Sequence, residues 1–148
     1  MKKKNLLFPK NVCCYLFSII IIFIGCSPKI NATQTIPTGD NSMVSLDWDG
    51  TYTGTIPCAD CQGIETSLTL KKDKTYLLKT KYLGKSNTFT EKSGTFTWNT
   101  EGSTIILQGI SNAPNQYLVG ENLLFQLDMA GKRITGGLAD SYKLRKVQ

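Results

Sequence analysis

The chain has 148 residues, a formal net charge of +6, five cysteines and no histidine. Its length allows one domain with its own hydrophobic core. The lack of histidine excludes zinc and copper(II) sites that are built on imidazole ligands. The positive charge does not indicate nucleic-acid binding, because no cluster of Lys and Arg is combined with stacking aromatic residues.

The first 25 residues have the pattern of a bacterial export signal. Lysines at positions 2, 3, 4 and 10 precede an apolar run of 13 residues from Val12 to Ile24. That run is shorter than the roughly 20 residues that cross a bilayer and fits the apolar part of a signal peptide. It ends in Phe23-Ile24-Gly25-Cys26, which resembles the lipobox of bacterial lipoproteins. We therefore predict a lipoprotein signal peptide at residues 1–25 and lipidation of Cys26; a short uncleaved anchor is the alternative.

Removal of the signal changes the charge and the cysteine count of the mature chain. Four of the 17 Lys and Arg residues precede Cys26 and all 11 Asp and Glu residues follow it, which leaves a net charge of about +2. Cys13 and Cys14 leave with the signal, so Cys58 and Cys61 remain free to pair in the exported domain. We expect the mature protein in the bacterial cell envelope, anchored by lipid to the outer membrane and facing the periplasm.

Residues 26–47 are predicted to be the lipidated cysteine and a flexible tether. The segment is rich in Ser, Thr, Asn, Pro and Gly and has no periodic pattern, and such a composition buries too little apolar surface to become ordered. A tether of about 20 residues spans roughly 25 Å on average. The domain that follows is therefore expected to lie close to the membrane surface.

From Trp48 onward the sequence shows period-two alternation of apolar and polar residues, interrupted by turn residues, with no sustained helical period. Short strands joined by short turns predict an antiparallel meander. We predict an all-β fold for residues 48–148, a small closed β-barrel whose interior is either packed or holds one small ligand. The expected strands are 51–56, 64–70, 76–82, 94–98, 104–107, 116–119, 123–127 and 141–145, with weak pairing at 88–91.

The stretch Pro57-Cys58-Ala59-Asp60-Cys61-Gln62-Gly63-Ile64 lies between two of these strands. Pro57 is expected to end the first strand and Gly63 to permit the turn into the second, which puts the cysteine pair at one mouth of the barrel. Two thiols at this spacing can form a disulfide, bind a soft metal ion such as Cu(I), or exchange electrons. A disulfide that closes so short a loop adds only about 2 kcal/mol of stability. The residues alone therefore leave a local disulfide and a metal- or redox-responsive pair both open.

Other candidate sites in the sequence are weaker. Asp60 and Glu65 flank the cysteine motif as a conceivable acid–base pair, but an Asp in a tight turn is expected to cap backbone N–H groups. Trp48 and Trp98 could line a ligand pocket or pack in the core. A thioredoxin-like activity is disfavoured because no helix is expected to follow the pair. With no histidine, phosphate-binding loop or serine nucleophile motif, we predict a protein that is not an enzyme.

The run around Cys58 and Cys61, within the stretch from Asp49 to Thr66, resembles the opening of the N-terminal domain of the NlpE family. This is a family of bacterial outer-membrane lipoproteins linked to copper resistance and envelope stress. The resemblance implies a lipocalin-like β-barrel; it makes copper a candidate cofactor, with no cofactor required by the residues themselves, and an envelope-stress signalling protein a candidate partner. Longer family members carry a second, OB-like domain with its own cysteine pair, and signalling that depends on that domain is not carried over to this chain. Further segments that fit the family are Tyr82-Leu83-Gly84, Gly94-Thr95-Phe96-Thr97-Trp98, the hairpin from Leu123 to Ile134, and Tyr142-Lys143-Leu144.

Three functions are consistent with these features. The first is a membrane-anchored lipoprotein of copper tolerance or envelope-stress sensing, with Cys58 and Cys61 as its responsive pair and Pro57, Asp60 and Gly63 as supporting residues. The second is a carrier that binds a small apolar ligand at the barrel mouth, with a structural disulfide. The third is an inhibitor of cell-wall hydrolases, for which a charge near +2 is unfavourable because cationic lysozymes require an acidic inhibitor.

Overall fold

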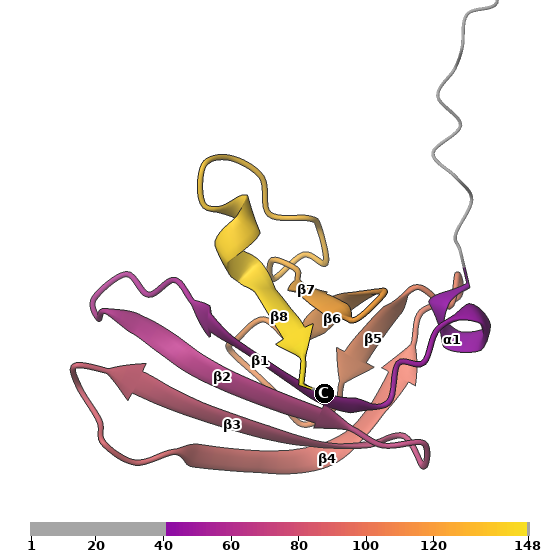
Figure 1. The fold of residues 1–148 in the computed structure, drawn as a ribbon, viewed down its shortest axis with the longest axis horizontal. Coiled ribbons are helices and arrows are strands. Elements are labelled where there is room, and N and C mark those ends of the chain that lie inside the picture. The colour runs from indigo at the N-terminus through magenta and orange to yellow at the C-terminus, as the bar shows by residue number, and fades with distance from the viewer. Residues whose placement is uncertain (1–40, 148) are drawn as a thin grey trace, which may run out of the picture. The chain divides into compact units, whose positions relative to one another are not determined.

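The alternation seen in the sequence produces eight strands that close into an antiparallel barrel, each strand pairing with the next and the last with the first (Figure 1). The computed structural model describes residues 41–147. The signal peptide, the lipidation at Cys26 and the tether before Asn41 lie outside the described residues. The strands are β1 Gly50–Ile56, β2 Gly63–Leu70, β3 Thr75–Leu83, β4 Thr90–Trp98, β5 Thr104–Leu107, β6 Gln116–Gly120, β7 Leu123–Gln126 and β8 Lys143–Lys146.

The prediction of an all-β meander barrel is confirmed. Inward-facing residues of successive strands form one core, and the fully buried members include Tyr52, Phe96 and Leu124. Closure between β1 and β8 needs a glycine, because a Cβ at Gly54 would lie 2.6 Å from the Lys143 carbonyl oxygen. Every strand has a neighbour on both sides, so residues 41–147 complete their own sheet and core and form a self-contained folding unit.

The fourth strand is longer than the sequence pattern predicts. β4 runs without a break from Thr90 to Trp98, whereas weak pairing at 88–91 and a separate strand at 94–98 were expected. Its first half pairs with β3 from Thr80 opposite Thr90 to Tyr76 opposite Gly94, but only residues 96–98 pair with β5. The polar residues of the first half gave no alternating signal because this part of the barrel wall is exposed.

Residues 41–47 do not belong to a free tether, and this corrects the expected end of the tether at residue 47. They form a one-turn helix, α1 (Ser42–Ser45), at the end of the barrel opposite the β1–β2 and β3–β4 loops (Figure 1). The buried Ser42 hydroxyl donates a hydrogen bond of 2.8 Å to the Val119 carbonyl, and the Met43 N–H donates to the Gly102 carbonyl. Long-range hydrogen bonds thus order a segment whose composition predicts disorder.

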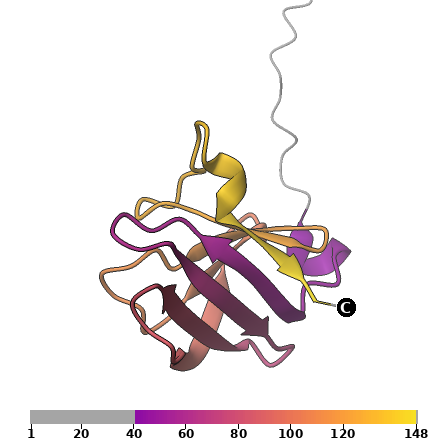
Figure 2. The same cartoon turned by 60° about the vertical axis from the view of Figure 1, so that its left-hand side comes forward.

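An aromatic cluster fills the barrel next to α1. The rings of Trp48, Phe96 and Trp98 meet edge to face, with centroids 5.6 to 6.4 Å apart. The Trp48 indole donates a hydrogen bond to the Met43 carbonyl, and the Tyr52 hydroxyl donates one of 2.8 Å to the Trp48 carbonyl. Both tryptophans therefore close this end of the barrel. Figure 2 shows the backbone of the barrel from a second direction.

The connection between β7 and β8 completes the description of residues 41–147. A 3₁₀ turn, η1 (Ala139–Tyr142), follows the long β7–β8 loop and leads into β8. None of the helices in this part of the chain combines the length and the apolar character that crossing a bilayer requires.

Candidate functional site

The cysteine pair lies in the loop of residues 57–62, between β1 and β2, at the barrel end away from α1 (Figure 1). A disulfide joins Cys58 to Cys61, with their Cα atoms 5.3 Å apart. β1 ends at Ile56, immediately before Pro57. Gly63 starts β2 at a φ of 148°, and a Cβ there would lie 2.6 Å from the Thr55 Cγ2 methyl. The loop thus needs its proline and glycine for the geometric reasons that the sequence suggests.

An ion pair fixes this loop to the neighbouring β3–β4 loop. The exposed Asp60 carboxylate accepts a hydrogen bond from the Lys85 ammonium, and this contact holds the pKa of Asp60 below its usual value. The Gln62 N–H donates to the Leu83 carbonyl at 3.2 Å. Asp60 was expected to cap the turn, but its main partner is a lysine 25 residues away, which no local pattern reveals.

Three potential ligand atoms converge in the loop. The sulfurs of Cys58 and Cys61 and a carboxylate oxygen of Asp60 all lie within 4.8 Å of one another, and the Asp60 Oδ1 is 3.4 Å from the Cys58 sulfur. Two thiolates suit Cu(I), which prefers soft sulfur ligands, whereas a carboxylate oxygen is a hard ligand. The reduced pair therefore fits Cu(I), with Asp60 as a nearby charge rather than a third ligand.

The structure brings none of the other sequence candidates into this loop site. Glu65 lies on β2 and pairs with Lys81, so it does not form an acid–base pair with Asp60. Trp48 and Trp98 pack in the closed end of the barrel.

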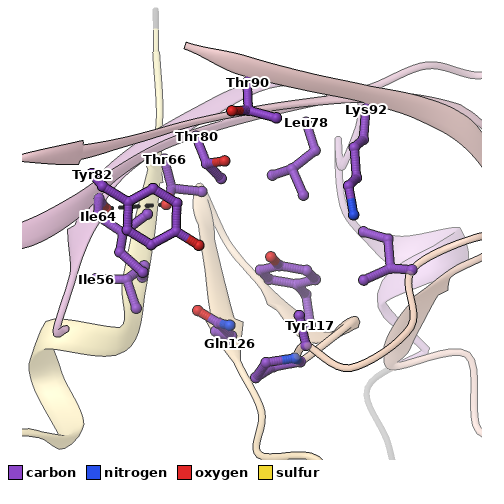
Figure 3. A pocket seen from close by; sticks show the side chains of 13 residues that line it. Ile56, Ile64, Thr66, Leu78, Thr80, Tyr82, Thr90, Lys92, Tyr117 and Gln126 are labelled. Atoms are coloured by element: carbon purple, nitrogen blue, oxygen red, sulfur yellow. Dashed lines mark hydrogen bonds between the residues drawn. The ribbon is translucent and has the colours of Figure 1, made fainter. Parts of the chain in front are cut away.

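A cavity of about 350 Å³ opens inside the barrel on the side of the disulfide loop. Ile56 and Ile64, the residues that flank the loop, form part of its wall, and the β5–β6 loop contributes Ile110 and Pro114. Figure 3 shows the Tyr117 ring near the centre of the lining and the Lys92 side chain extending from β4 into the same space. The remaining lining residues are Thr66, Leu78, Thr80, Tyr82, Thr90, Ala113 and Gln126.

The sequence left a ligand site at the barrel mouth open as an alternative, but it did not identify Tyr117 or Lys92 as residues of this cavity. Tyr117 is 2% exposed, and burial raises the pKa of its hydroxyl above the ordinary value. Lys92 lies on the inward face of β4, opposite Leu78 in the register. Lysine at an inward position is the one signal in the sequence that the interior is not fully packed, and it is recognisable only once the extent of β4 is known.

The profile of the NlpE N-terminal domain matches residues 52–137, more than half of the chain. The chain belongs to the NlpE family. The lipoprotein NlpE of Escherichia coli K12 is 33% identical over 119 residues, which are 79% of this chain and 50% of that protein. This chain therefore spans half the length of that NlpE relative.

Two solved structures are also similar to this chain. The crystal structure of a lipoprotein from Shewanella oneidensis has 50% sequence identity to this chain and a TM-score of 0.66. The match includes 73% of this chain and 96% of the Shewanella chain. The crystal structure of the Cpx pathway activator NlpE from Escherichia coli has 30% sequence identity to this chain and a TM-score of 0.46. The match includes 60% of this chain and 46% of the Escherichia coli chain. The sequence resemblance to the NlpE family is confirmed, and it makes the chain a member of a bacterial envelope lipoprotein family.

Proposed function

We propose that this NlpE-family lipoprotein acts in copper tolerance or envelope-stress sensing at the outer membrane, with the Cys58–Cys61 pair as its responsive element. The observation that carries the proposal is the position of the pair. Both sulfurs lie in a short loop at the open end of the barrel, where a reductant and a metal ion have access, and not between distant strands, where a disulfide stabilises most.

The chemistry of the response has two steps. A dithiol reductant gives two electrons and two protons to the disulfide and is itself oxidised to a disulfide, which leaves Cys58 and Cys61 as thiols. One Cu(I) ion then binds both sulfurs as thiolates and displaces the two protons. The loop would thus report copper only under conditions that keep the pair reduced, and a signalling partner would recognise the changed loop.

The negative charge of Asp60 tunes this pair. Its carboxylate lies 3.4 Å from the Cys58 sulfur, so it opposes charge on the bare thiolates and favours a cation beside them. Lys85 offsets part of that charge through its ion pair with Asp60. One Cu(I) with two thiolates carries a net charge of −1, which repels the Asp60 carboxylate and attracts the Lys85 ammonium, so binding is expected to shift this ion pair and connects the metal site to the β3–β4 loop.

The test is a copper titration of residues 41–148, which contain no cysteines besides Cys58 and Cys61. After reduction, the protein is titrated with Cu(I) in the presence of a competing chelator, beside a Cys58→Ser/Cys61→Ser variant. Uptake of one Cu(I) per chain that the variant loses supports the proposal. Equal uptake by both proteins overturns the copper site. Cells that produce the full chain should then tolerate more copper than cells with the double serine variant.

A further inference from the structure

The barrel cavity has the size of a site for one small ligand. Its volume of about 350 Å³ is at the lower end of the range of roughly 300–1,000 Å³ found for ligand pockets. With about 30 Å³ for each non-hydrogen atom, the share of a water molecule in the liquid, the cavity holds about 12 such atoms. A chain of ten carbons with a two-oxygen head group has this size.

One polar group faces the cavity without a hydrogen-bond partner among residues 41–147. Tyr117 is 2% exposed, and its hydroxyl makes no hydrogen bond within residues 41–147. Figure 3 shows this hydroxyl directed into the space between Thr80, Leu78 and Gln126. Because this hydroxyl faces the cavity, it is available to donate a hydrogen bond to an acceptor of a bound ligand.

The charge of the cavity comes from one residue. Lys92 is the only charged side chain among the lining residues, and its ammonium forms no ion pair in the part of the chain that the structure describes. Its sequence neighbour Glu91 points outward and pairs with Lys79 at 2.6 Å. Lys92 is exposed, so it supplies this positive charge at the solvent-accessible mouth of the cavity, where it favours the anionic head group of a ligand.

The rest of the lining is suited to an apolar chain. Ile56, the last residue of β1, lies opposite Ile64 near the start of β2. Together with Leu78 they form an apolar part of the cavity wall. Figure 3 places these two isoleucines and Tyr82 on the side of the cavity away from Lys92. The cavity therefore has a charged side and an apolar side, with Tyr117 between them.

We infer that the barrel binds a small amphipathic carboxylate, with an apolar chain of about ten carbons. The head group accepts hydrogen bonds from the Lys92 ammonium and the Tyr117 hydroxyl, and the chain lies along Ile56, Ile64 and Leu78. This site uses neither sulfur of the disulfide loop and does not depend on copper binding. The sequence alone suggests a small apolar ligand. The lining of the cavity adds that the ligand carries a negative charge and has about 12 non-hydrogen atoms.

The test compares three probes of matched chain length by calorimetric titration of residues 41–148 with the disulfide intact. The probes are decanoate, decan-1-ol and decylammonium, each below its micellar concentration. Decanoate should bind one to one and at least tenfold more tightly than either of the others, because only it satisfies both Lys92 and Tyr117. Equal affinity for decan-1-ol, or no decanoate binding at millimolar concentration, overturns the inference.

Matched variants locate the site. Lys92→Met should weaken decanoate binding about tenfold, whereas Lys79→Met, which removes the same charge one register step away on the outer face, should leave it unchanged. Tyr117→Phe should weaken binding about fivefold to tenfold without lowering the thermal midpoint of the free protein, because its hydroxyl has no partner there. Equal effects of Lys92→Met and Lys79→Met would overturn the site.

Discussion

Ile56 and Ile64 are direct partners in the ladder between β1 and β2, and both side chains line the barrel cavity. The disulfide loop, residues 57–62, and Gly63 connect the two isoleucines. The responsive loop and the cavity wall therefore adjoin at this pair, which flanks the loop on both sides. Any change in the loop that displaces this isoleucine pair will also change the cavity, and the coupling has to act in both directions.

Loss of the disulfide should lower stability modestly. The Cys58→Ser/Cys61→Ser variant should have a free energy of unfolding about 2 kcal/mol below that of the oxidised protein, since the bond closes a very short loop. Urea unfolding followed by tryptophan fluorescence measures this difference. A reductant should bring the original protein to the same value and leave the variant unaffected. An equal effect of the reductant on both proteins would show that the loop bond is not the cause.

The ion pair of Asp60 and Lys85 should control the reactivity of the reduced thiols more than it controls stability. Both side chains are largely exposed, and exposed pairs add at most about 1 kcal/mol. Asp60→Asn removes the negative charge beside Cys58 and should speed alkylation of the reduced protein by iodoacetamide at pH 7 severalfold. Lys85→Met should slow it. If the two variants change the rate in the same direction, charge is not the controlling factor.

The hydrogen bond of Ser42 should contribute measurably to the closed end of the barrel. Ser42→Ala removes a buried bond of 2.8 Å to the Val119 carbonyl and should cost about 1 kcal/mol of unfolding free energy. Ser45→Ala, in the same helical turn but exposed, is the matched control and should cost nothing measurable. Identical urea midpoints for the two variants would show that α1 does not stabilise the barrel.

Tyr52 should make the protein sensitive to alkaline pH. Burial, together with the negative charges of Asp47 and Asp49, raises the pKa of Tyr52 to about 12, against 10 in the unfolded chain. Between these values the unfolded chain releases its proton first, so the native state binds more protons and stability falls as pH rises. The full fall is roughly 2–3 kcal/mol, complete near pH 12.

Replacement of this tyrosine isolates its part of the pH dependence. Tyr52→Phe loses the hydrogen bond to the Trp48 carbonyl and should be about 1 kcal/mol less stable at pH 8. Above pH 10 its stability should decline less steeply than that of the original protein, as measured by urea unfolding at each pH. Parallel declines would assign the alkaline sensitivity to other groups.

The sequence was sufficient to predict the strands that alternate between the core and solvent. On β1 Tyr52 and Ile56 share the inward face, and on β2 Leu68 and Leu70 do the same; all four are buried. Period-two patterning therefore predicts these strands. It failed for the first half of β4, where the wall is exposed and Glu91, Lys92 and Ser93 give no apolar contrast. It also failed for residues 41–47, whose order depends on acceptors at Gly102 and Val119 that lie far along the chain.

The candidate site was predictable only in its local part. The cysteine spacing with its proline and glycine placed the pair at a hairpin end, because those residues act on their own neighbours. Strand register and barrel closure bring Lys85 to the disulfide loop and bring Lys92 and Tyr117 to the cavity. Both are features of the tertiary structure. Residues that act across such distances leave no mark in a single sequence.

The two ends of the barrel differ, because α1 and the two tryptophans plug one end only. The described chain begins at Asn41 in this end, while the disulfide loop lies at the other (Figure 1). The cavity opens on the side of that loop. Whatever precedes Asn41 in the chain is therefore joined to the barrel at its plugged end. The sulfur pair and the cavity mouth lie at the end away from this junction, so an attachment through the preceding chain leaves both of them uncovered by the junction itself.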